Sequence, residues 1–274
     1  MSWRPSAALE QLEARAALVD GLRQFFKMRG SLEVEAPAIA PAPASDPWID
    51  SFKVIDPAGV TQGYLLSSPE TYLKRLLAAY KCPIHSLGKA YRANEQGHQH
   101  AVEFTMLEWY RPADSDPFHA MIAEIQDLIR TLTPFDAPVV CSYRDLFESA
   151  FGINPHQATV KQLSPLAAPI LGAKTASSLD LDSLLNLLFS TEIEPGLHGH
   201  LVIDFPAVQA ALSRIEVNGQ GDSVAKRAEL YLDGVEIANG YHELTDADEQ
   251  RDRCVADQAN RTRLHRPQVP LDED

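Results

Sequence analysis

Hydrophobic side chains recur every three or four residues near the start of the chain. The pattern covers residues 6–29 and predicts an amphipathic helix. Gly30 follows and suits the end of a helix, where glycine readily adopts a left-handed backbone. Residues 32–39 predict a short strand that Pro37 ends, because proline has no backbone N–H to donate. Pro37 is also the first of four closely spaced prolines, which predict a loop up to residue 47.

The same patterns predict further elements along the chain. Helical spacing indicates helices at 68–80, 117–133 and 181–191. The first of these has Ser68 as its N-cap and Pro69 in its first turn. Two strands are expected around a polar loop at 93–101, and HLVIDFP at 200–206 predicts a buried strand. Residues 152–180 are rich in small and turn-forming side chains and are expected to form a peripheral insertion.

The composition is that of a globular protein. Of the 274 residues, 45% are hydrophobic and 23% are charged, which is ordinary for a domain with an ample core. The formal net charge of −14 weighs against a protein whose main task is to grip nucleic-acid phosphates. No apolar run approaches the roughly 20 residues of a membrane span, and no signal peptide is evident. Three widely separated cysteines indicate reduced thiols, so we expect a cytoplasmic protein without a membrane partner.

A hairpin near the C-terminus brings two carboxylates together. The sequence KRAELYLDGVEIANGYHELTD spans 226–246, and its Asp-Gly pair at 233–234 is a strong signal for a tight turn. Counting from that turn, Tyr231 lies opposite Glu236 and Glu229 lies diagonal to it, all on one face. Two such carboxylates can hold a divalent cation, and magnesium prefers oxygen ligands of this kind. The alternative is an exposed polar sheet face without a ligand.

The second strand of this hairpin continues with further polar side chains. If the chain stays extended, Asn239, Tyr241 and Glu243 share one face. An amide, a phenol and a carboxylate together suit a ligand that carries an amine. A solvated polar face is again the alternative.

The stretch EFTMLEWYR at 103–111 places a carboxylate in an apolar strand. Its alternation puts Phe104, Glu108 and Tyr110 on one face, together with Met106. A carboxylate in such surroundings needs a partner if it is buried. The ammonium group of a ligand would serve, and so would a structural arginine.

The polar loop in YRANEQGHQH, at 91–100, follows an arginine. Arg92 ends the preceding strand, and its planar guanidinium can bind a phosphate or a carboxylate through two hydrogen bonds. The loop itself contributes Glu95, His98 and His100. A metal site built from the two histidines is disfavoured, because short HxH patterns are common, and HGH at 198–200 repeats the pattern without other ligands nearby.

Together these stretches resemble the catalytic domain of a class II aminoacyl-tRNA synthetase of the lysine type. GSLEVEAPAI at 30–39 resembles motif 1, with Pro37 at its fixed proline, and residues 91–111 resemble motif 2 with its FTMLEWY signature. SSPETYLKRLL at 67–77 and EIANGYHELTD at 236–246 are characteristic of the lysine branch. Within that branch the chain is similar to the stand-alone paralogues that modify elongation factor P, because it has no room for an anticodon-binding barrel.

The resemblance implies an architecture and an activity. We expect residues 1–274 to form one catalytic domain, an α+β fold with an antiparallel sheet flanked by helices, dimeric through motif 1 and without anticodon recognition. We expect the enzyme to use ATP and Mg²⁺ to activate lysine or β-lysine as an aminoacyl-adenylate. The aminoacyl group would then pass to a lysine side chain of elongation factor P.

The resemblance also assigns roles to individual residues. Arg92 would be catalytic, touching both the substrate carboxylate and the α-phosphate, and Phe104 would stack on adenine. Glu229 and Glu236 would hold magnesium on the phosphates. The ATP site as a whole would comprise Arg92, Glu95, His98, His100, Phe104, Glu229 and Glu236. The amino-acid pocket would comprise Glu70, Glu108, Tyr110, Asn239, Tyr241 and Glu243.

The sequence departs from the family pattern in two places. In motif 2 the usual HNPEF reads HAVEF, so Ala101 and Val102 replace an amide and a proline, and the loop acid Glu95 lies three residues after Arg92 rather than two. The glycine-rich motif 3, which ends in GxGxDR, does not occur, so the fold is expected to be incomplete at its C-terminal side. The chain is then a truncated ligase or an impaired paralogue that binds an amino acid or nucleotide as a regulator. Charging of lysine tRNA is a further alternative.

Overall fold

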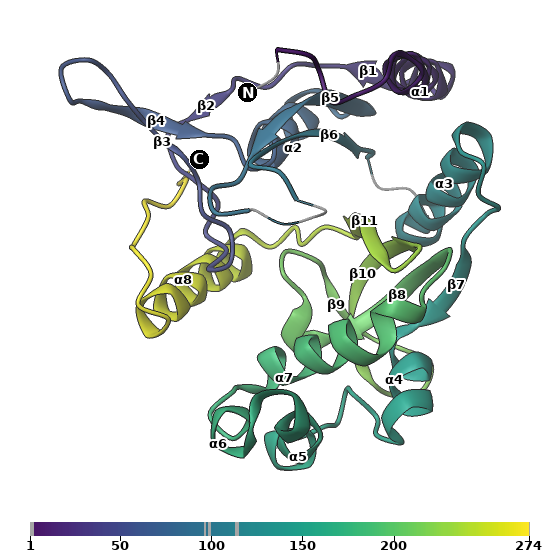
Figure 1. The fold of residues 1–274 in the computed structure, drawn as a ribbon, viewed down its shortest axis with the longest axis vertical. Coiled ribbons are helices and arrows are strands. Elements are labelled where there is room, and N and C mark those ends of the chain that lie inside the picture. The colour runs from purple at the N-terminus through teal and green to yellow at the C-terminus, as the bar shows by residue number, and fades with distance from the viewer. Residues whose placement is uncertain (1–2, 96, 98–99, 113–114, 274) are drawn as a thin grey trace. The chain divides into compact units, whose positions relative to one another are not determined.

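The computed structural model describes residues 3–95, 97, 100–112 and 115–273, and Figure 1 labels their helices and strands. They form two compact units. The first unit consists of Met1–Asp114 and Arg251–Asp274, and the second of Ser115–Gln250. Both contain helices and mainly antiparallel sheets, which confirms the expected α+β class. The assignment of 1–274 to one catalytic domain stays a prediction.

A long helix opens the first unit, as the hydrophobic spacing predicts. Helix α1 (Leu9–Met28) directs Phe25 and Phe26 into the core, where both are almost fully buried. Gly30 follows with a φ of +71°, and its N–H donates to the carbonyl of Lys27 at 3.1 Å. Glycine adopts this backbone conformation without the strain that a Cβ would add.

The prediction of one strand at 32–39 is wrong, because only the two ends of this stretch pair with other strands. These ends form β1 (Leu32–Glu33) and β2 (Ile39–Ala40), which belong to different sheets. Pro37 lies in the segment between them and cannot donate to a continuous ladder. The chain therefore leaves one sheet and enters another within a few residues.

Two three-stranded sheets make up the rest of the first unit, in the orders β1-β5-β6 and β2-β4-β3. Their other strands are β3 (Lys53–Ile55), β4 (Thr61–Leu65), β5 (Ile84–Tyr91) and β6 (Glu103–Tyr110). Strands β5 and β6 are antiparallel, which confirms the two strands expected around the polar loop. Helix α2 (Glu70–Tyr80) packs against both strands, and the Oγ of Ser68 accepts the N–H of Glu70 at 3.0 Å.

Helix α8 (Ala247–Arg263) was not expected from the hydrophobic pattern. Its side chains are mostly charged or polar, so it lacks the apolar stripe that marks a helix in a sequence. Polar contacts attach it instead. Arg261 is only 2% exposed, and its guanidinium donates to backbone carbonyls in the loop that precedes β3.

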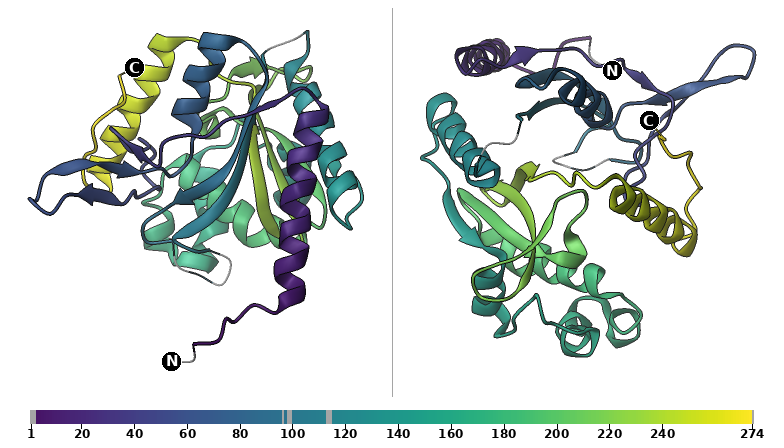
Figure 2. Two further views of the ribbon diagram at one scale, coloured as in Figure 1. Left: turned by 90° about the horizontal axis from the view of Figure 1, so that it is seen from above. Right: turned by 180° about the vertical axis from the view of Figure 1, so that it is seen from behind.

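A five-stranded sheet forms the centre of the second unit, with the order β11-β10-β8-β7 and β9 paired to β10. Strands β8 to β11 of this sheet are drawn in shades of green in Figure 2. The strands are β7 (Val139–Ser142), β8 (His200–Pro206), β9 (Ile215–Val217), β10 (Ser223–Leu232) and β11 (Val235–Tyr241). The strand expected at 200–206 and the hairpin turn at 233–234 are confirmed.

Helices cover both faces of this sheet. Helix α3 (Pro117–Leu132), close to the helix expected at 117–133, packs near Lys226 and Gly240. On the opposite face lie α4 (Tyr143–Phe151), α5 (Val160–Leu171), α6 (Ala173–Ala176) and α7 (Leu181–Leu188). The helix expected at 181–191 changes after α7 into a π-helical turn, η1 (Phe189–Ile193).

The stretch at 152–180 is more regular than its composition suggests. It contains α5 and α6, and the side chains of Leu163 and Ala167 are fully buried in the core of the unit. Tyr143, Phe189 and Phe205 form the aromatic part of that core, with the rings of Tyr143 and Phe189 stacked at 4.5 Å. These helices therefore brace the sheet face that carries Glu229.

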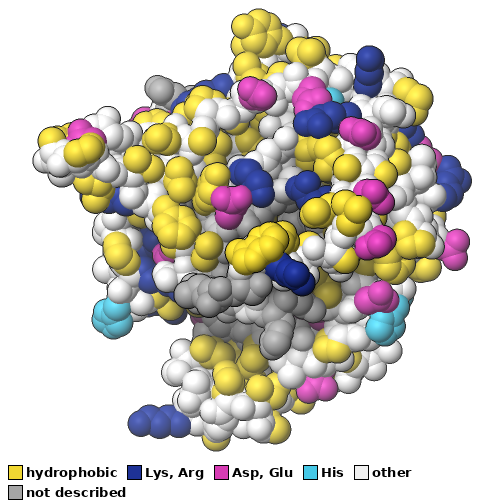
Figure 3. Space-filling view, turned by 45° about the horizontal axis from the view of Figure 1, so that its top comes forward, with side chains coloured by type: hydrophobic (Ala, Val, Ile, Leu, Met, Phe, Trp, Pro, Cys, Tyr) yellow, Lys and Arg dark blue, Asp and Glu magenta, His cyan; other side chains and the backbone are white. Residues whose placement is uncertain are grey.

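The surface has a mixed character. On the face shown in Figure 3, acidic and basic side chains are interspersed with hydrophobic ones, so neither sign of charge dominates that view. Across the described residues, no helix combines the length and the apolar character that crossing a membrane would require.

Candidate active site

A β-bulge in the β10–β11 hairpin decides which side chains share a face. The pairing follows the expected register from the turn up to Tyr231 opposite Glu236. It then skips Ile237, so that Glu229 lies opposite Asn239 and Arg227 opposite Tyr241. The extra residue reverses the alternation beyond it. The two predicted polar sets, which simple alternation would place on opposite faces, therefore lie on the same face of the sheet.

The carboxylate of Glu229 is held from two sides. The side chain is 5% exposed and forms an ion pair with the guanidinium of Arg227, and its other oxygen accepts the hydroxyl of Tyr231. Arg227 in turn donates to the carbonyl of Gln209 at 2.8 Å and lies over the ring of Phe205. Burial and the charge of Glu229 raise the pKa of Tyr231, so its hydroxyl keeps the proton that it donates.

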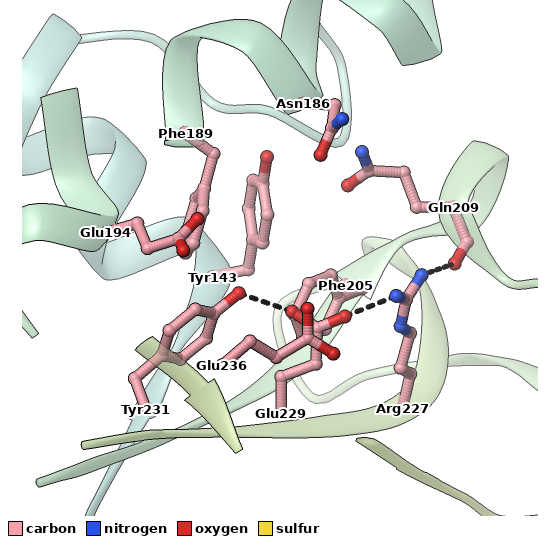
Figure 4. A pocket seen from close by; sticks show the side chains of 10 residues that line it. All are labelled: Tyr143, Asn186, Phe189, Glu194, Phe205, Gln209, Arg227, Glu229, Tyr231 and Glu236. Atoms are coloured by element: carbon pink, nitrogen blue, oxygen red, sulfur yellow. Dashed lines mark hydrogen bonds and ion pairs between the residues drawn. The ribbon is translucent and has the colours of Figure 1, made fainter. Parts of the chain in front are cut away.

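Both predicted metal ligands line one cavity in the second unit, and Figure 4 shows the contacts that hold Glu229 there. The cavity measures about 100 Å³ and also receives the carboxyl group of Glu194. Burial, together with the charge of Glu229, raises the pKa of Glu194. The other lining residues are Tyr143, Asn186, Phe189, Phe205, Gln209, Arg227 and Tyr231.

The donor set of this cavity fits a hydrated magnesium ion. Each carboxylate oxygen has more than one acceptor position, so the contacts of Glu229 with Arg227 and Tyr231 leave capacity for a metal. Among the residues that the structure describes, no three His, Cys, Asp or Glu side chains form a metal cage. Glu229 and Glu236 would thus hold the ion while phosphate oxygens and water complete its shell, as magnesium usually requires.

In the first unit, Arg92 follows β5 and lies beside β6. The guanidinium of Arg92 lies 5.3 Å from the centre of the Phe104 ring. The backbone N–H of Arg92 donates to the carbonyl of Val102 at 3.1 Å. The Nε of Arg92 is buried and has no hydrogen-bond partner among the described residues. A buried guanidinium nitrogen without a partner is costly unless a ligand satisfies it. The site therefore fits an anion such as a phosphate or carboxylate.

Three residues of the predicted amine pocket, Glu70, Glu108 and Tyr110, lie in the first unit, where β6 meets α2. Glu108 accepts hydrogen bonds from the Oγ of Ser68 at 2.6 Å and from the hydroxyl of Tyr110 at 3.0 Å. Burial, reinforced by the negative charge of Glu70, raises the pKa of Glu108 to about 7 against the opposing hydrogen bonds. Glu70 itself forms an ion pair with Lys74, one turn further along α2.

The remaining predicted residues lie as follows. Asn239 is exposed, Tyr241 and Glu243 are half-buried, and Glu243 forms an isolated bridge with Ser213. The guanidinium of Arg227 lies 5.9 Å from the centre of the Tyr241 ring. Glu95 is half-buried, whereas His100 is exposed. His98 lies outside the described residues.

The structure adds four residues that the sequence patterns did not single out for a site: Ser68, Lys74, Glu194 and Arg227. Arg227 could have been found, because it lies two residues before Glu229 and must share its face. Ser68 was assigned only to the helix start, and nothing local indicates its contact with Glu108, which is 40 residues away. No spacing or motif in the sequence distinguishes Lys74 or Glu194 from other charged residues.

Comparison with known proteins identifies the family of this chain. The family model of class II tRNA synthetases (D, K and N) matches residues 1–268. The elongation factor P–(R)-β-lysine ligase of Sodalis glossinidius (strain morsitans) is 41% identical over 282 residues, which cover 100% of this chain and 85% of that protein. The protein of the same name from Edwardsiella ictaluri (strain 93-146) is 40% identical over 281 residues, which cover 99% and 85%. The chain therefore belongs to the class II tRNA synthetase family, as its motifs indicate.

Proposed function

We propose that this protein activates β-lysine or lysine with ATP and transfers the aminoacyl group to a lysine side chain of elongation factor P. The acceptor and the β-amino acid come from the name shared by relatives that match the chain over its whole length. The observation in the structure that carries the proposal is the pair of carboxylates Glu70 and Glu108, which lie close enough for the charge of Glu70 to raise the pKa of Glu108. Two neighbouring carboxylates, one held by two hydroxyl groups, suit a ligand with two amino groups.

Activation is a displacement at the α-phosphorus of ATP. A carboxylate oxygen of the amino acid forms the new P–O bond, the bond to the bridging oxygen breaks, and pyrophosphate leaves. Arg92 is the residue we assign to the charge that develops on the α-phosphate, because its buried Nε has no other partner in the described residues. Phe104, beneath this guanidinium, offers an aromatic surface for the adenine ring. Glu95, His98 and His100 would complete the ATP loop.

Magnesium would neutralise part of the phosphate charge that this displacement redistributes. Glu229 and Glu236 are the residues we assign to it, and Arg227 and Tyr231 fix the orientation of Glu229. Second-shell contacts of this kind orient the ligands of metal sites.

Transfer completes the reaction. The amine nitrogen of the acceptor lysine attacks the carbonyl carbon of the adenylate, the C–O bond to AMP breaks, and the amine loses a proton. We assign Glu108 and Tyr110 to an amino group of the substrate. The assignment of Asn239, Tyr241 and Glu243, a polar set in the second unit, to amine binding rests on the sequence resemblance alone. We further propose a cytoplasmic homodimer, supported by apolar side chains that α1 leaves exposed, among them Leu9 and Leu12.

ATP–pyrophosphate exchange tests the first step. The purified protein should catalyse exchange that depends on β-lysine or lysine. The variant Arg92→Ala should lose it, because the developing phosphate charge then has no guanidinium partner. Arg130→Ala is a matched control, since Arg130 is 69% exposed and pairs with its neighbour Asp127 on α3. Exchange that survives in Arg92→Ala at the wild-type rate would contradict the assigned role.

A further inference from the structure

Asp50 lies where three segments of the first unit meet. It precedes β3, and its carboxylate oxygen Oδ2 accepts hydrogen bonds from two distant parts of the chain. One donor is the guanidinium of Arg266, just after α8, at 3.0 Å. The other is the side-chain amide of Asn94, in the turn after β5, at 3.2 Å. A single carboxylate thus joins the C-terminal helix to the segment that follows Arg92.

The backbone strengthens this connection. The N–H of Ala93 donates to the carbonyl of Asp50 at 2.7 Å, and the two residues form an isolated antiparallel bridge. Asn94 has a φ of +65°, a left-handed conformation that asparagine tolerates better than most residues but that still costs energy. The backbone is therefore held at Arg92, whose N–H donates to the carbonyl of Val102, and at Ala93, whose N–H donates to the carbonyl of Asp50.

Helix α8 anchors the segment that carries Asp50. Arg261 is 2% exposed, and its guanidinium donates three hydrogen bonds of 2.7–3.0 Å to backbone carbonyls. The acceptors are the carbonyl oxygens of Ser45, Asp46 and Ile49. The guanidinium of Arg266 also lies 5.4 Å from the centre of the Trp48 ring. Breaking such charge-assisted hydrogen bonds around a buried guanidinium is expensive, so α8 fixes the loop firmly.

We propose that Asp50 is a positioning residue of the ATP site, which couples the end of helix α8 to the direction of the Arg92 side chain. The turn at 93–94 follows Arg92 directly, so its geometry decides whether the guanidinium stays over the ring of Phe104. Asp50 touches no reacting group in this arrangement and acts only through the turn. The proposal rests on the proposed function of Arg92, and the experiments below separate the two.

Hydrogen exchange tests the connection without relying on activity. In Asp50→Ala and in Arg266→Ala, the amides of residues 93–95 should exchange faster, because the turn loses one of its attachments. Arg251→Ala is the matched control, since Arg251 lies on the same helix and forms an exposed ion pair with Glu273. Unchanged exchange in both test variants, or an equal increase in the control, would overturn the proposal.

ATP binding tests the consequence for the site. Titration calorimetry with ATP and Mg²⁺ should show affinity reduced about fivefold to tenfold in Asp50→Ala and Arg266→Ala. This loss is smaller than the full contribution of one charge-assisted hydrogen bond, because Asp50 acts on the site only through the turn. Lysine binding should be unchanged, and Arg266→Lys should recover most of the ATP affinity. Equal losses for ATP and lysine would indicate a merely structural role and refute the proposal. Absence of ATP binding in the wild-type protein would instead refute the proposed function, while the exchange data still decide whether Asp50 holds the turn.

Discussion

The protonation of Glu108 should control how tightly the protein binds an amino acid. Burial is the main cause that raises its pKa, and the charge of Glu70 adds to it. Hydrogen bonds from Ser68 and Tyr110 and the nearby ammonium of Lys74 oppose the shift. The resulting pKa of about 7 lies well above the ordinary 4.5 of glutamate. The group therefore changes its charge within the pH range in which the enzyme can be assayed.

The size of the effect follows from this pKa of about 7. Glu108 is ionised in about half of the molecules at pH 7 and in about a tenth at pH 6. Only the ionised carboxylate attracts an ammonium group, so the affinity for lysine should fall about fivefold from pH 7 to pH 6. Glu108→Gln should bind lysine weakly at every pH in this range and should lose the pH dependence.

The same shift makes a prediction about stability. Because the pKa of Glu108 is higher in the folded protein than in the unfolded chain, the folded state binds the proton more tightly. This group therefore favours folding most below about pH 4.5, and the contribution is lost as the pH rises towards 7. The loss is about 3 kcal/mol, from about 1.4 kcal/mol for each pKa unit. Glu108→Gln should flatten this part of the stability curve.

Calorimetric titration with lysine at pH 6, 7 and 8 provides the assay. Glu103→Gln is a matched control, because Glu103 lies on the opposite face of β6, is 50% exposed and pairs with Lys89 at 2.9 Å. The control should keep the wild-type pH dependence. Wild-type affinity that does not change between pH 6 and 8, or a Glu108→Gln variant that retains the full dependence, would refute the reasoning.

Three further predictions concern the metal site and the fold. Glu236→Gln should raise the Mg²⁺ concentration needed for half-maximal ATP–pyrophosphate exchange about tenfold, and an unchanged requirement would argue against this ligand. Gly63→Ala should lower the free energy of unfolding by about 2 kcal/mol, because Gly63 has a φ of +141° and an added Cβ would lie 2.5 Å from the carbonyl oxygen of Ala40; chemical denaturation measures this. Leu163→Ala should cost about 3 kcal/mol by the same measurement, since Leu163 is fully buried, and a cost near zero would show that residues 152–180 are peripheral after all.

Local alternation was sufficient to predict some features of the sites. It placed Glu108 and Tyr110 on one face of β6, and the hydroxyl of Tyr110 indeed donates to Glu108. It also set the register next to the turn, where Tyr231 lies opposite Glu236. Both results follow from the period of two in a strand and from the strong turn preference of Asp-Gly.

Features that depend on contacts between distant segments could not be predicted from the sequence patterns. The bulge at Ile237 leaves no mark in the pattern of polar and apolar residues, yet it decides the face of Asn239 and Tyr241. Helix α8 lacks the apolar stripe by which a helix is predicted. Buried hydrogen bonds of Arg261, rather than hydrophobic contacts, attach it to the rest of the first unit. Among the groups that shift the pKa of Glu108, Ser68, Glu70 and Lys74 lie in α2 or just before it, and only the folded chain brings them to β6.

Modification of elongation factor P is the most direct test of the central claim. Purified elongation factor P should be incubated with this protein, ATP, Mg²⁺ and β-lysine, and its intact mass should then be measured. We predict a mass increase of one β-lysyl group on a lysine side chain, which disappears without ATP and with Arg92→Ala. An unmodified elongation factor P, obtained with folded protein that binds ATP and β-lysine, would contradict the account.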